Sequence, residues 1–362
     1  MATVRIKAIM RARLALCTAI GCLLADVAIA AKKKPKKERP EETQVLELPK
    51  DPPQAVVAET DRLVFHVSPL SSKGLLSQQI RDGIKALWND SKGSQIVKIR
   101  AFVAGSGDMR RVPSVVSEMF TDKRQPIPAV SVVQVGGLQM DGAQVVLESI
   151  ATNKKVVNKN GIAFVSGQVA TTSDAISPLK SALGDMQPRA ITCFLNTLEE
   201  AGKVRGQVVG AYPAAVVNVV QVRRDTMGDF VECEAVAAPV APPQSVDFRK
   251  PAEGRYSEAV ILGPGKVVFT GTQLAFGAKE DDVRLAFGRL EKALNSVGAK
   301  LSDTVMTHMY PLSSAAAECV RKVRFEFYDA KKPPASTLLV FEGLPSLDAL
   351  LGMEVVTKAG QT

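Results

Sequence analysis

The sequence predicts an α+β fold made of three units, each a mixed β-sheet with two helices on one face. The main observation is that one order of segments occurs three times, over residues 98–148, 189–236 and 305–357. Each copy has an apolar run, a polar turn, a helix-length segment, a β-branched run and a short run with Glu. A chain of 362 residues can hold three such units. Internal repeats fix an architecture, so the copies predict related units.

The other elements also recur in each copy. A strand that ends in small or polar residues is expected at 62–69, 161–168 and 266–273. Apolar residues at helical spacing predict helices over 75–88 and 283–299. The second copy has only a short helix-like segment at this point, ISPLKSALGDM, followed closely by a proline. Each unit is therefore predicted to have the element order β-α-β-α-β-β, with its helices on one face of a sheet.

Composition places the unit boundaries. The first and most diverged unit is expected over 62–152, the second over 156–237 and the third over 253–358. A Pro-rich linker is expected over 238–252. Residues 31–61 combine lysines, glutamates and five prolines, and are expected to be a disordered tether because they cannot bury enough apolar surface.

Residues 1–30 resemble a signal peptide. Basic residues precede the apolar run LALCTAIGCLLADVAIA, which ends in the small-x-small pattern of Ala28 and Ala30. A membrane anchor is the alternative, but the run is short and Asp26 interrupts it. A lipidated Cys22 is another alternative. We expect a secreted or periplasmic protein with no stable membrane insertion after cleavage.

The sequence has few residues suited to a zinc site or to Ser-His-Asp catalysis. Cys193, Cys233 and Cys319 remain after the signal, at no metal-ligand spacing, and we expect buried thiols at 193 and 233 rather than a disulfide. His66 and His308 lie in apolar strands and are expected to be core or cleft-wall residues. No metal and no cofactor are therefore predicted.

The third copy resembles the RidA (YjgF-type) imine deaminase family. The resemblance rests on GRYSEAV at 254–260, VVFTGTQ at 267–273, PPASTLLVFEGLP at 333–345 and MEVVT at 353–357. The second copy keeps Ser-Gly-Gln at 166–168 and ends in EAVA, and the first ends in ESIA. The resemblance implies a chorismate-mutase-like fold that assembles as a trimer with ligand clefts between subunits. Three copies in one chain then predict an intramolecular pseudotrimer that is a monomer in solution.

The resemblance also implies a site that has changed here. In the family, an arginine in a Pro-Ala-Arg-Ser phrase binds the carboxylate of an imino acid, a pairing that suits a guanidinium. The aligned positions here are Val130, Val217 and Ser336. We expect the carboxylates beside them to lack a counter-charge, with Arg223 and Arg224 as the nearest substitutes.

The acidic residue of the last strand is kept in every copy. The candidate catalytic residues are thus Glu354, Glu234 and Glu148. The candidate ligand-cleft residues come from the phrases that the copies retain. They are Tyr256, Ser336, Thr337, Thr272, Gln273, Ser166, Gly167 and Gln168.

These observations predict a small-ligand-binding or scaffold protein without standard imine deaminase activity. One alternative is a RidA-type hydrolase that deaminates a neutral enamine or imine, favoured by the retained glutamates. The other is RNA binding or cleavage. The net charge of +9 permits it, but no aromatic and basic platform supports it, so no nucleic-acid partner is expected.

Overall fold

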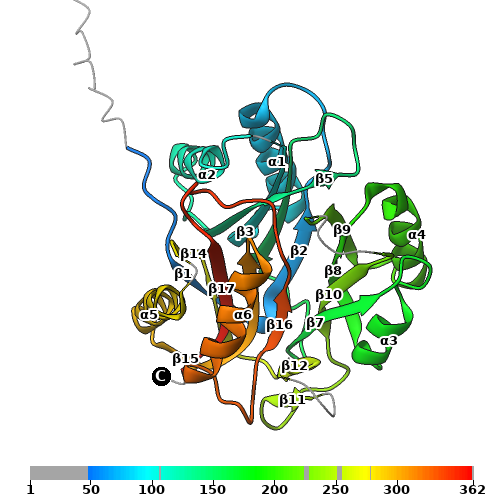
Figure 1. Ribbon diagram of the computed structural model, residues 1–362, viewed down its shortest axis with the longest axis vertical. Coiled ribbons are helices and arrows are strands. Elements are labelled where there is room, and N and C mark those ends of the chain that lie inside the picture. Colours follow the sequence, from blue (N-terminus) through cyan, green and yellow to red (C-terminus); the bar gives the residue numbers. More distant parts are fainter. Residues whose placement is uncertain (1–47, 106, 224–227, 251–254, 278, 361–362) are drawn as a thin grey trace, which may run out of the picture. The chain divides into compact units, whose positions relative to one another are not determined.

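The computed structural model describes residues 48–105, 107–223, 228–250, 255–277 and 279–360. The expected signal peptide over 1–30, Cys22 and most of the expected tether lie outside these residues. No helix among the described residues is long and apolar enough to cross a membrane. The strands form three sheets with an α+β organisation (Figure 1).

The first sheet has the strand order β2-β6-β3-β4. In β3, apolar side chains alternate with Lys98 and Arg100, and yet nearly the whole strand is buried. A sheet covered on both faces explains this. The bounds are β2 Leu63–Val67, β3 Gln95–Ala104, β4 Ala129–Val135 and β6 Val145–Thr152, with helices α1 Leu76–Ser91 and α2 Arg111–Asp122.

The second sheet has the order β11-β12-β7-β10-β8-β9-β5. Its first helix has only seven residues, as the abbreviated segment ISPLKSALGDM indicated. The bounds are β5 Gly137–Leu138, β7 Ile162–Ala170, β8 Gln187–Leu195, β9 Val216–Gln221, β10 Val231–Ala238, β11 Asp247–Arg249 and β12 Ala259–Leu262, with α3 Ser177–Leu183 and α4 Ala201–Ala211.

The third sheet has the order β1-β13-β17-β15-β16, and β14 also pairs with β17. Helix α5 begins with three acidic residues, which favour the positive end of the helix dipole. The bounds are β1 Ala55–Glu59, β13 Lys266–Thr270, β14 Gln273–Ala275, β15 Ala299–Pro311, β16 Ala335–Leu338 and β17 Leu351–Ala359, with α5 Glu280–Asn295 and α6 Ser314–Val323.

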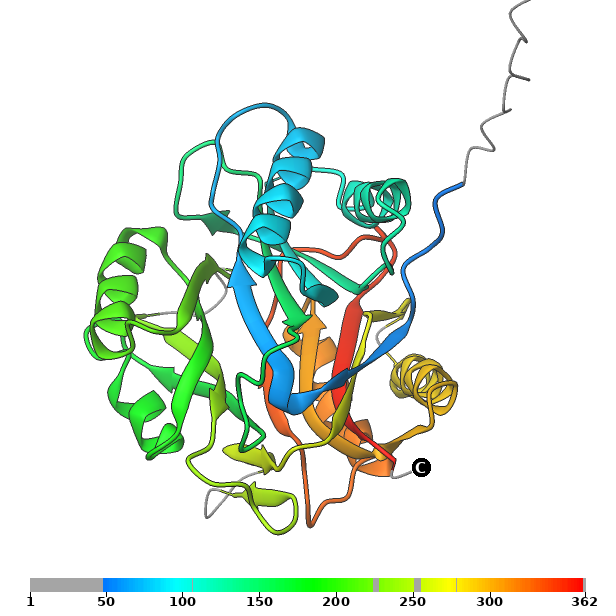
Figure 2. The ribbon, with the colours of Figure 1, turned by 180° about the vertical axis from the view of Figure 1, so that it is seen from behind.

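The three sheets share one pairing pattern. In each, the strand after the first helix runs parallel to the strand after the second helix, as in β3/β4, β8/β9 and β15/β16. The last long strand then pairs antiparallel to the first member of that pair. Each pair of helices covers a core of its own sheet, and the views from front and back show three separate groups of helices around the strands (Figures 1 and 2).

The other faces of the sheets meet in a shared central core. Its members include Phe65 of β2, Phe164 of β7 and Phe269 of β13, which are the fourth residues of the three first-strand phrases. A second shared cluster contains Phe102, Phe194 and Tyr310, and links the sheets through edge-on ring contacts. Each sheet therefore buries one face under helices and the other against its neighbours.

The unit boundaries predicted from composition need correction. Residues 55–59, expected in the tether, form β1, which pairs with β13 in the third sheet. Residues 247–249, expected in the linker, form β11. Strand β12, expected in the third unit, pairs with β7 and belongs to the second sheet. The first strands of two units thus lie in a neighbouring sheet, which composition cannot reveal.

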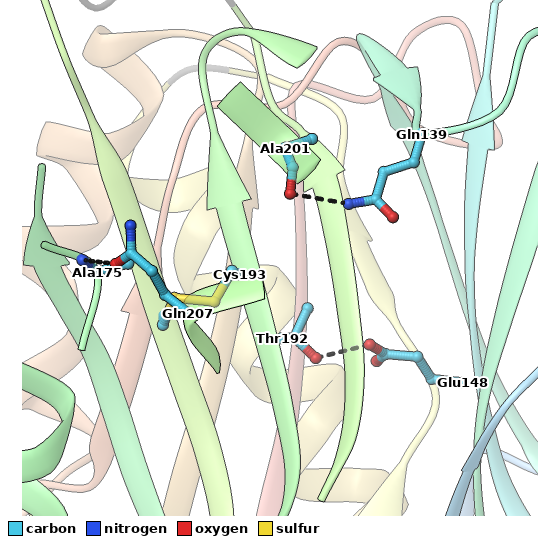
Figure 3. Close-up of a disulfide and its surroundings, with 8 residues drawn as sticks. Gln139, Glu148, Ala175, Thr192, Cys193, Ala201 and Gln207 are labelled. Carbon is cyan, nitrogen blue, oxygen red and sulfur yellow. Dashed lines mark hydrogen bonds between the residues drawn. A yellow bond between two sulfur atoms is a disulfide. The ribbon is translucent and has the colours of Figure 1, made fainter. Parts of the chain in front are cut away.

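The expectation of buried thiols at Cys193 and Cys233 was wrong. These residues lie directly opposite each other on β8 and β10, with 4.1 Å between their Cα atoms, and form a disulfide (Figure 3). Both are fully buried in the core of the second sheet. Two apolar strand-like runs can bring cysteines together when the strands are neighbours, which their sequence separation of 40 does not indicate.

Candidate functional site

The three candidate glutamates occupy the same register position in the three sheets. Glu148 lies opposite Arg100, Glu234 opposite Thr192, and Glu354 opposite His308. Glu234 and Glu354 are buried, and Glu148 is mostly buried. The central faces of the sheets thereby bring three carboxylates into one cluster.

Each glutamate accepts a hydrogen bond from the next sheet. Asn218 Nδ2 donates to Glu148 Oε1 at 2.9 Å, and Thr337 Oγ1 donates to Glu234 Oε2 at 2.5 Å. Ser131 Oγ donates to Glu354 in the same way. In the sequence, each donor directly follows one of the positions aligned with the family arginine, which are Val217, Ser336 and Val130. The same kind of hydrogen bond therefore occurs at each of the three junctions between sheets.

Two cations of the first sheet neutralise negative charge in this cluster. The expectation that the carboxylates lack a counter-charge was therefore wrong. Arg100 donates from Nε to Glu148 Oε2 and from Nη2 to Glu234 Oε1, both at 2.8 Å. Lys98 Nζ donates to Glu354 Oε2 at 2.5 Å. Both cations are more than nine-tenths buried. These positive charges come from β3 and not from Arg223, whose Nη1 donates to the carbonyl of Leu312. Arg224, the other expected substitute, lies outside the described residues.

His308 and Tyr310 complete the cluster from β15. His308 Nε2 lies 3.1 Å from Glu234 Oε1, and its Nδ1 lies 3.4 Å from Glu354 Oε1. Tyr310 donates its hydroxyl to Glu354 Oε1 at 2.6 Å. His308 is thus a core residue, as expected, but one that faces two carboxylates.

The electrostatics keep Glu234 and Glu354 ionised. Burial alone would raise the pKa of Glu354, but the charges of Lys98, His308 and Arg100 lower it to about 2. The pKa of Glu234 is also lowered, because His308 and Arg100 outweigh its burial. Carboxylates held by so many donors are suited to a structural role and poorly suited to proton transfer near neutral pH.

A cavity of about 80 Å³ lies beside the cluster and is lined by residues of all three sheets. The charged residues Lys98 and Arg100 line it together with Phe65, Phe164 and Phe269. Among the described residues, no group of His, Cys, Asp and Glu side chains is arranged to hold a metal ion.

The three positions aligned with the family arginine also share one register. Val130 lies opposite Ile99, Val217 opposite Ile191, and Ser336 opposite Thr307. Val130 and Val217 contact the helix-side cores of their own sheets. Their side chains therefore point away from the glutamates, because neighbouring residues of a strand alternate between faces.

The expected ligand-cleft residues are divided between two junctions. At the junction of the second and third sheets, Ser166 Oγ accepts from the Ser336 amide at 2.8 Å and donates to the Ser257 carbonyl at 2.5 Å. At the junction of the third and first sheets, the Thr272 amide donates to the Val130 carbonyl at 3.3 Å.

The remaining candidates follow this division. Gln273 lies in β14 beside Thr272, and Gly167 and Gln168 continue β7 beyond Ser166. Thr337 faces the central cluster, and Tyr256 is 37% exposed next to Ser257. The structure therefore divides the expected ligand-cleft residues between different places.

An open pocket lies at the junction of the first and second sheets. Its volume is about 530 Å³, and its lining includes Val67, Ser68, Val146, Arg205, Val217 and Asn218. Arg205 of α4 donates from Nη1 to the Val217 carbonyl at 2.7 Å, which fixes a guanidinium beside this pocket. The pocket lining includes Val217, one of the three positions aligned with the family arginine.

Glu232 is a site residue that sequence reasoning missed. It lies two residues before Glu234 in β10, is 8% exposed, and has no hydrogen-bond partner among the described residues. Its carboxyl group packs so closely on Gly167 that a side chain at 167 would clash with it. Burial, and then the charge of Glu234, raise the pKa of Glu232 to about 8. The Glu-x-Glu spacing on one strand could have indicated it.

Residues 248–359 match the family described as Endoribonuclease L-PSP. No curated protein matches the chain.

Solved structures that resemble the chain include a YjgF family member from Mycobacterium tuberculosis, with 24% identity over 32% of this chain and 100% of that chain, and a TM-score of 0.24. Another, from Neisseria meningitidis, has 14% identity over 33% and 98% of the two chains, and a TM-score of 0.25. A protein from Thermotoga maritima, described as a candidate endoribonuclease, has 20% identity over 33% and 99%, and a TM-score of 0.25. Residues 248–359 of the chain thus match the Endoribonuclease L-PSP family, the YjgF/RidA family.

Proposed function

We propose that the three sheets are copies of one unit, arranged as an intramolecular pseudotrimer. The hydrogen bonds from Asn218, Thr337 and Ser131 to the glutamates of the preceding sheets support this, because they repeat one relation at each junction. The purified mature protein should then have the mass of one chain in light scattering. A stable trimer of full-length chains would contradict the proposal.

The chain is proposed to be exported. The small-x-small pattern at Ala28 and Ala30 supports this, and so does the buried Cys193–Cys233 disulfide, because disulfides persist in oxidising compartments. Mass spectrometry of the protein from its native host should find Ala31 at or near the amino terminus. An intact Met1 on a soluble protein would contradict export, and a lipid on Cys22 would indicate a lipoprotein.

The chain is proposed to bind a small uncharged or largely apolar ligand and to lack 2-imino acid hydrolysis. The observation that carries this proposal is that the three equivalent glutamates are already held by Arg100, Lys98 and side chains of the neighbouring sheets. No such carboxylate is left to orient a water molecule. Binding would use the pocket between the first and second sheets, where Val217 stands at the position of the family arginine and the Arg205 guanidinium donates to the Val217 carbonyl.

A hydrolysis assay and a ligand screen test the two halves of this proposal. The wild-type protein should not hydrolyse 2-iminobutanoate faster than the free reaction. Ligands found by thermal shift should lose affinity in Val209→Trp, because Val209 lines the pocket and is exposed enough to accept a larger side chain. Val169→Trp, on an exposed residue outside the pocket lining, is the matched control. Hydrolysis well above the free rate, or ligands unaffected by Val209→Trp, would overturn the respective half.

A second candidate function is hydrolysis of a neutral enamine or imine at the junction of the second and third sheets. Glu232 favours it, because a buried carboxyl with a pKa of about 8 can donate a proton to a bound nitrogen and take one from water. Ser336 and Tyr256 lie at or near the same junction. Activity on an uncharged imine that Glu232→Gln abolishes would support this candidate.

RNA binding or cleavage is a third candidate function. It rests only on the family description and on the net charge of +9. A salt-dependent RNA-binding measurement tests it, because phosphate contacts weaken steeply as salt is added.

A further inference from the structure

The central cavity has two chemically different ends. Phe65, Phe164 and Phe269, one from each sheet, wall the apolar part. Arg100 and its carboxylate partners wall the polar part. This site is distinct from the pocket between the first and second sheets.

Arg100 has donors that the protein does not satisfy. Its Nε and Nη2 donate to Glu148, Glu234 and Thr192. Its Nη1 donates no hydrogen bond to any described residue, and Glu354 Oε1 lies 4.0 Å away from it. Arg100 is only 8% exposed and lines the cavity. An acceptor in the cavity would form a hydrogen bond with this charged donor, and such bonds are stronger than those between neutral groups.

The charges of the cluster favour an uncharged acceptor. Three glutamates face Lys98 and Arg100, and both ring nitrogens of His308 face carboxylate oxygens. The cations Lys98 and Arg100 therefore give the cluster no excess of positive charge that could bind an anion. An added anion would leave a net negative charge in a buried site, which is strongly unfavourable.

The cavity volume sets the size of the occupant. At about 80 Å³ it is larger than the ~30 Å³ share of one water molecule and about half of an apolar cavity of ~150 Å³ that holds benzene. An occupant of about four non-hydrogen atoms fits these limits. Its apolar part would contact the phenylalanine rings, and its acceptor would reach Arg100.

We propose that the central cavity is a binding site for a small uncharged molecule with one hydrogen-bond-accepting oxygen, of the size of a short ketone or alcohol. The acceptor binds Nη1 of Arg100, and the carbon atoms lie among Phe65, Phe164 and Phe269.

The test uses the mature wild-type protein with acetone as the probe and acetate as a charged probe of the same size. Nuclear Overhauser effects should connect the acetone methyl groups to the three phenylalanine rings. A crystal soaked in acetone should place its oxygen at hydrogen-bond distance from Arg100 Nη1. Acetate should bind at least tenfold more weakly than acetone.

A cavity-filling variant locates the binding. Ala190 lines the cavity at the register position that Met306 occupies in the third sheet, so Ala190→Met fills the space with a side chain that this core already uses. It should weaken acetone binding at least tenfold. Ala211→Met, at an exposed residue at the end of α4, should leave it unchanged.

Three outcomes would overturn the proposal. Ordered water alone on Arg100 Nη1 in the soaked crystal would show a hydrated cavity that excludes the probe. Equal binding of acetate would refute the charge argument. Acetone binding that Ala190→Met does not change would place the probe elsewhere. If Ala190→Met does not fold, the crystal and the Overhauser effects of the wild type decide.

Discussion

Asn218 of the second sheet donates a hydrogen bond of 2.9 Å to Glu148 of the first sheet, across a junction between two units. Thr337 donates to Glu234 in the same way, and Ser131 donates to Glu354. Because a buried carboxylate needs donors, no sheet satisfies its own glutamate without a neighbour. The polar centre therefore selects one arrangement of the three sheets, in addition to the apolar contacts that hold them.

Arg100 should be the residue whose loss costs most stability in this cluster. Arg100→Met removes the positive charge that pairs with Glu148 and Glu234, so both buried carboxylates lose this counter-charge. Breaking a buried ion pair in this way destabilises a protein by about 3–5 kcal/mol. Urea unfolding at pH 7 measures the change in the free energy of unfolding.

Arg284→Met is the matched control for Arg100→Met. Arg284 contacts three acidic side chains, Glu280, Asp281 and Glu326, but on the surface. Exposed ion pairs contribute about 0–1 kcal/mol, so its loss should matter little. Equal losses in the two variants would show that removing Arg100 leaves no costly unpaired charge in the central cluster.

Glu232 should make the protein less stable as the pH rises. Its pKa is about 8 in the folded protein and near 4.5 in the unfolded chain, so the folded state holds the proton more tightly. The contribution of Glu232 to stability is fully present below the unfolded pKa and is lost as the pH rises toward 8. One such group changes the free energy of unfolding by up to about 1.4 kcal/mol per pH unit.

Glu232→Gln should remove this dependence. The variant should be more stable than the wild type at pH 8, and the difference should shrink as the pH falls toward 4.5. Unfolding curves across this range measure it. Identical pH profiles for the two proteins would mean that Glu232 is ionised in the folded state.

The sequence predicted local elements well and contacts between sheets poorly. The strands that contain Phe65, Phe164 and Phe269 follow from their apolar phrases, and the glutamates follow from the repeated last strand. The partners of those glutamates do not follow, because Lys98 and Glu354 are separated by 256 residues. Two cations alternating with apolar residues in β3 were the available signal, since a buried strand seldom carries unpaired charges.

The disulfide should contribute measurably to stability. Cys193 and Cys233 close a loop with a sequence separation of 40, and a crosslink of that kind stabilises a domain by about 2–4 kcal/mol. The double variant Cys193→Ala/Cys233→Ala should unfold at correspondingly lower denaturant concentration. Peptide mapping without reductant should find the linked pair, and a mature protein with both thiols reactive after denaturation would contradict the bond.

Strand β1 should be part of the folded protein although it lies in a Pro-rich segment. All five of its residues pair with β13, Ala58 is buried, and Val56 packs against the central core. A chain that begins at Thr60 loses these contacts and leaves β13 as an open edge, which favours association with other chains. Fully burying one aliphatic side chain is worth about 1.5–3 kcal/mol, so a loss of at least about 2 kcal/mol is expected. A chain that begins at Leu48 keeps β1 and is the matched control. Equal unfolding midpoints for the two truncated chains would show that β1 does not stabilise the third sheet.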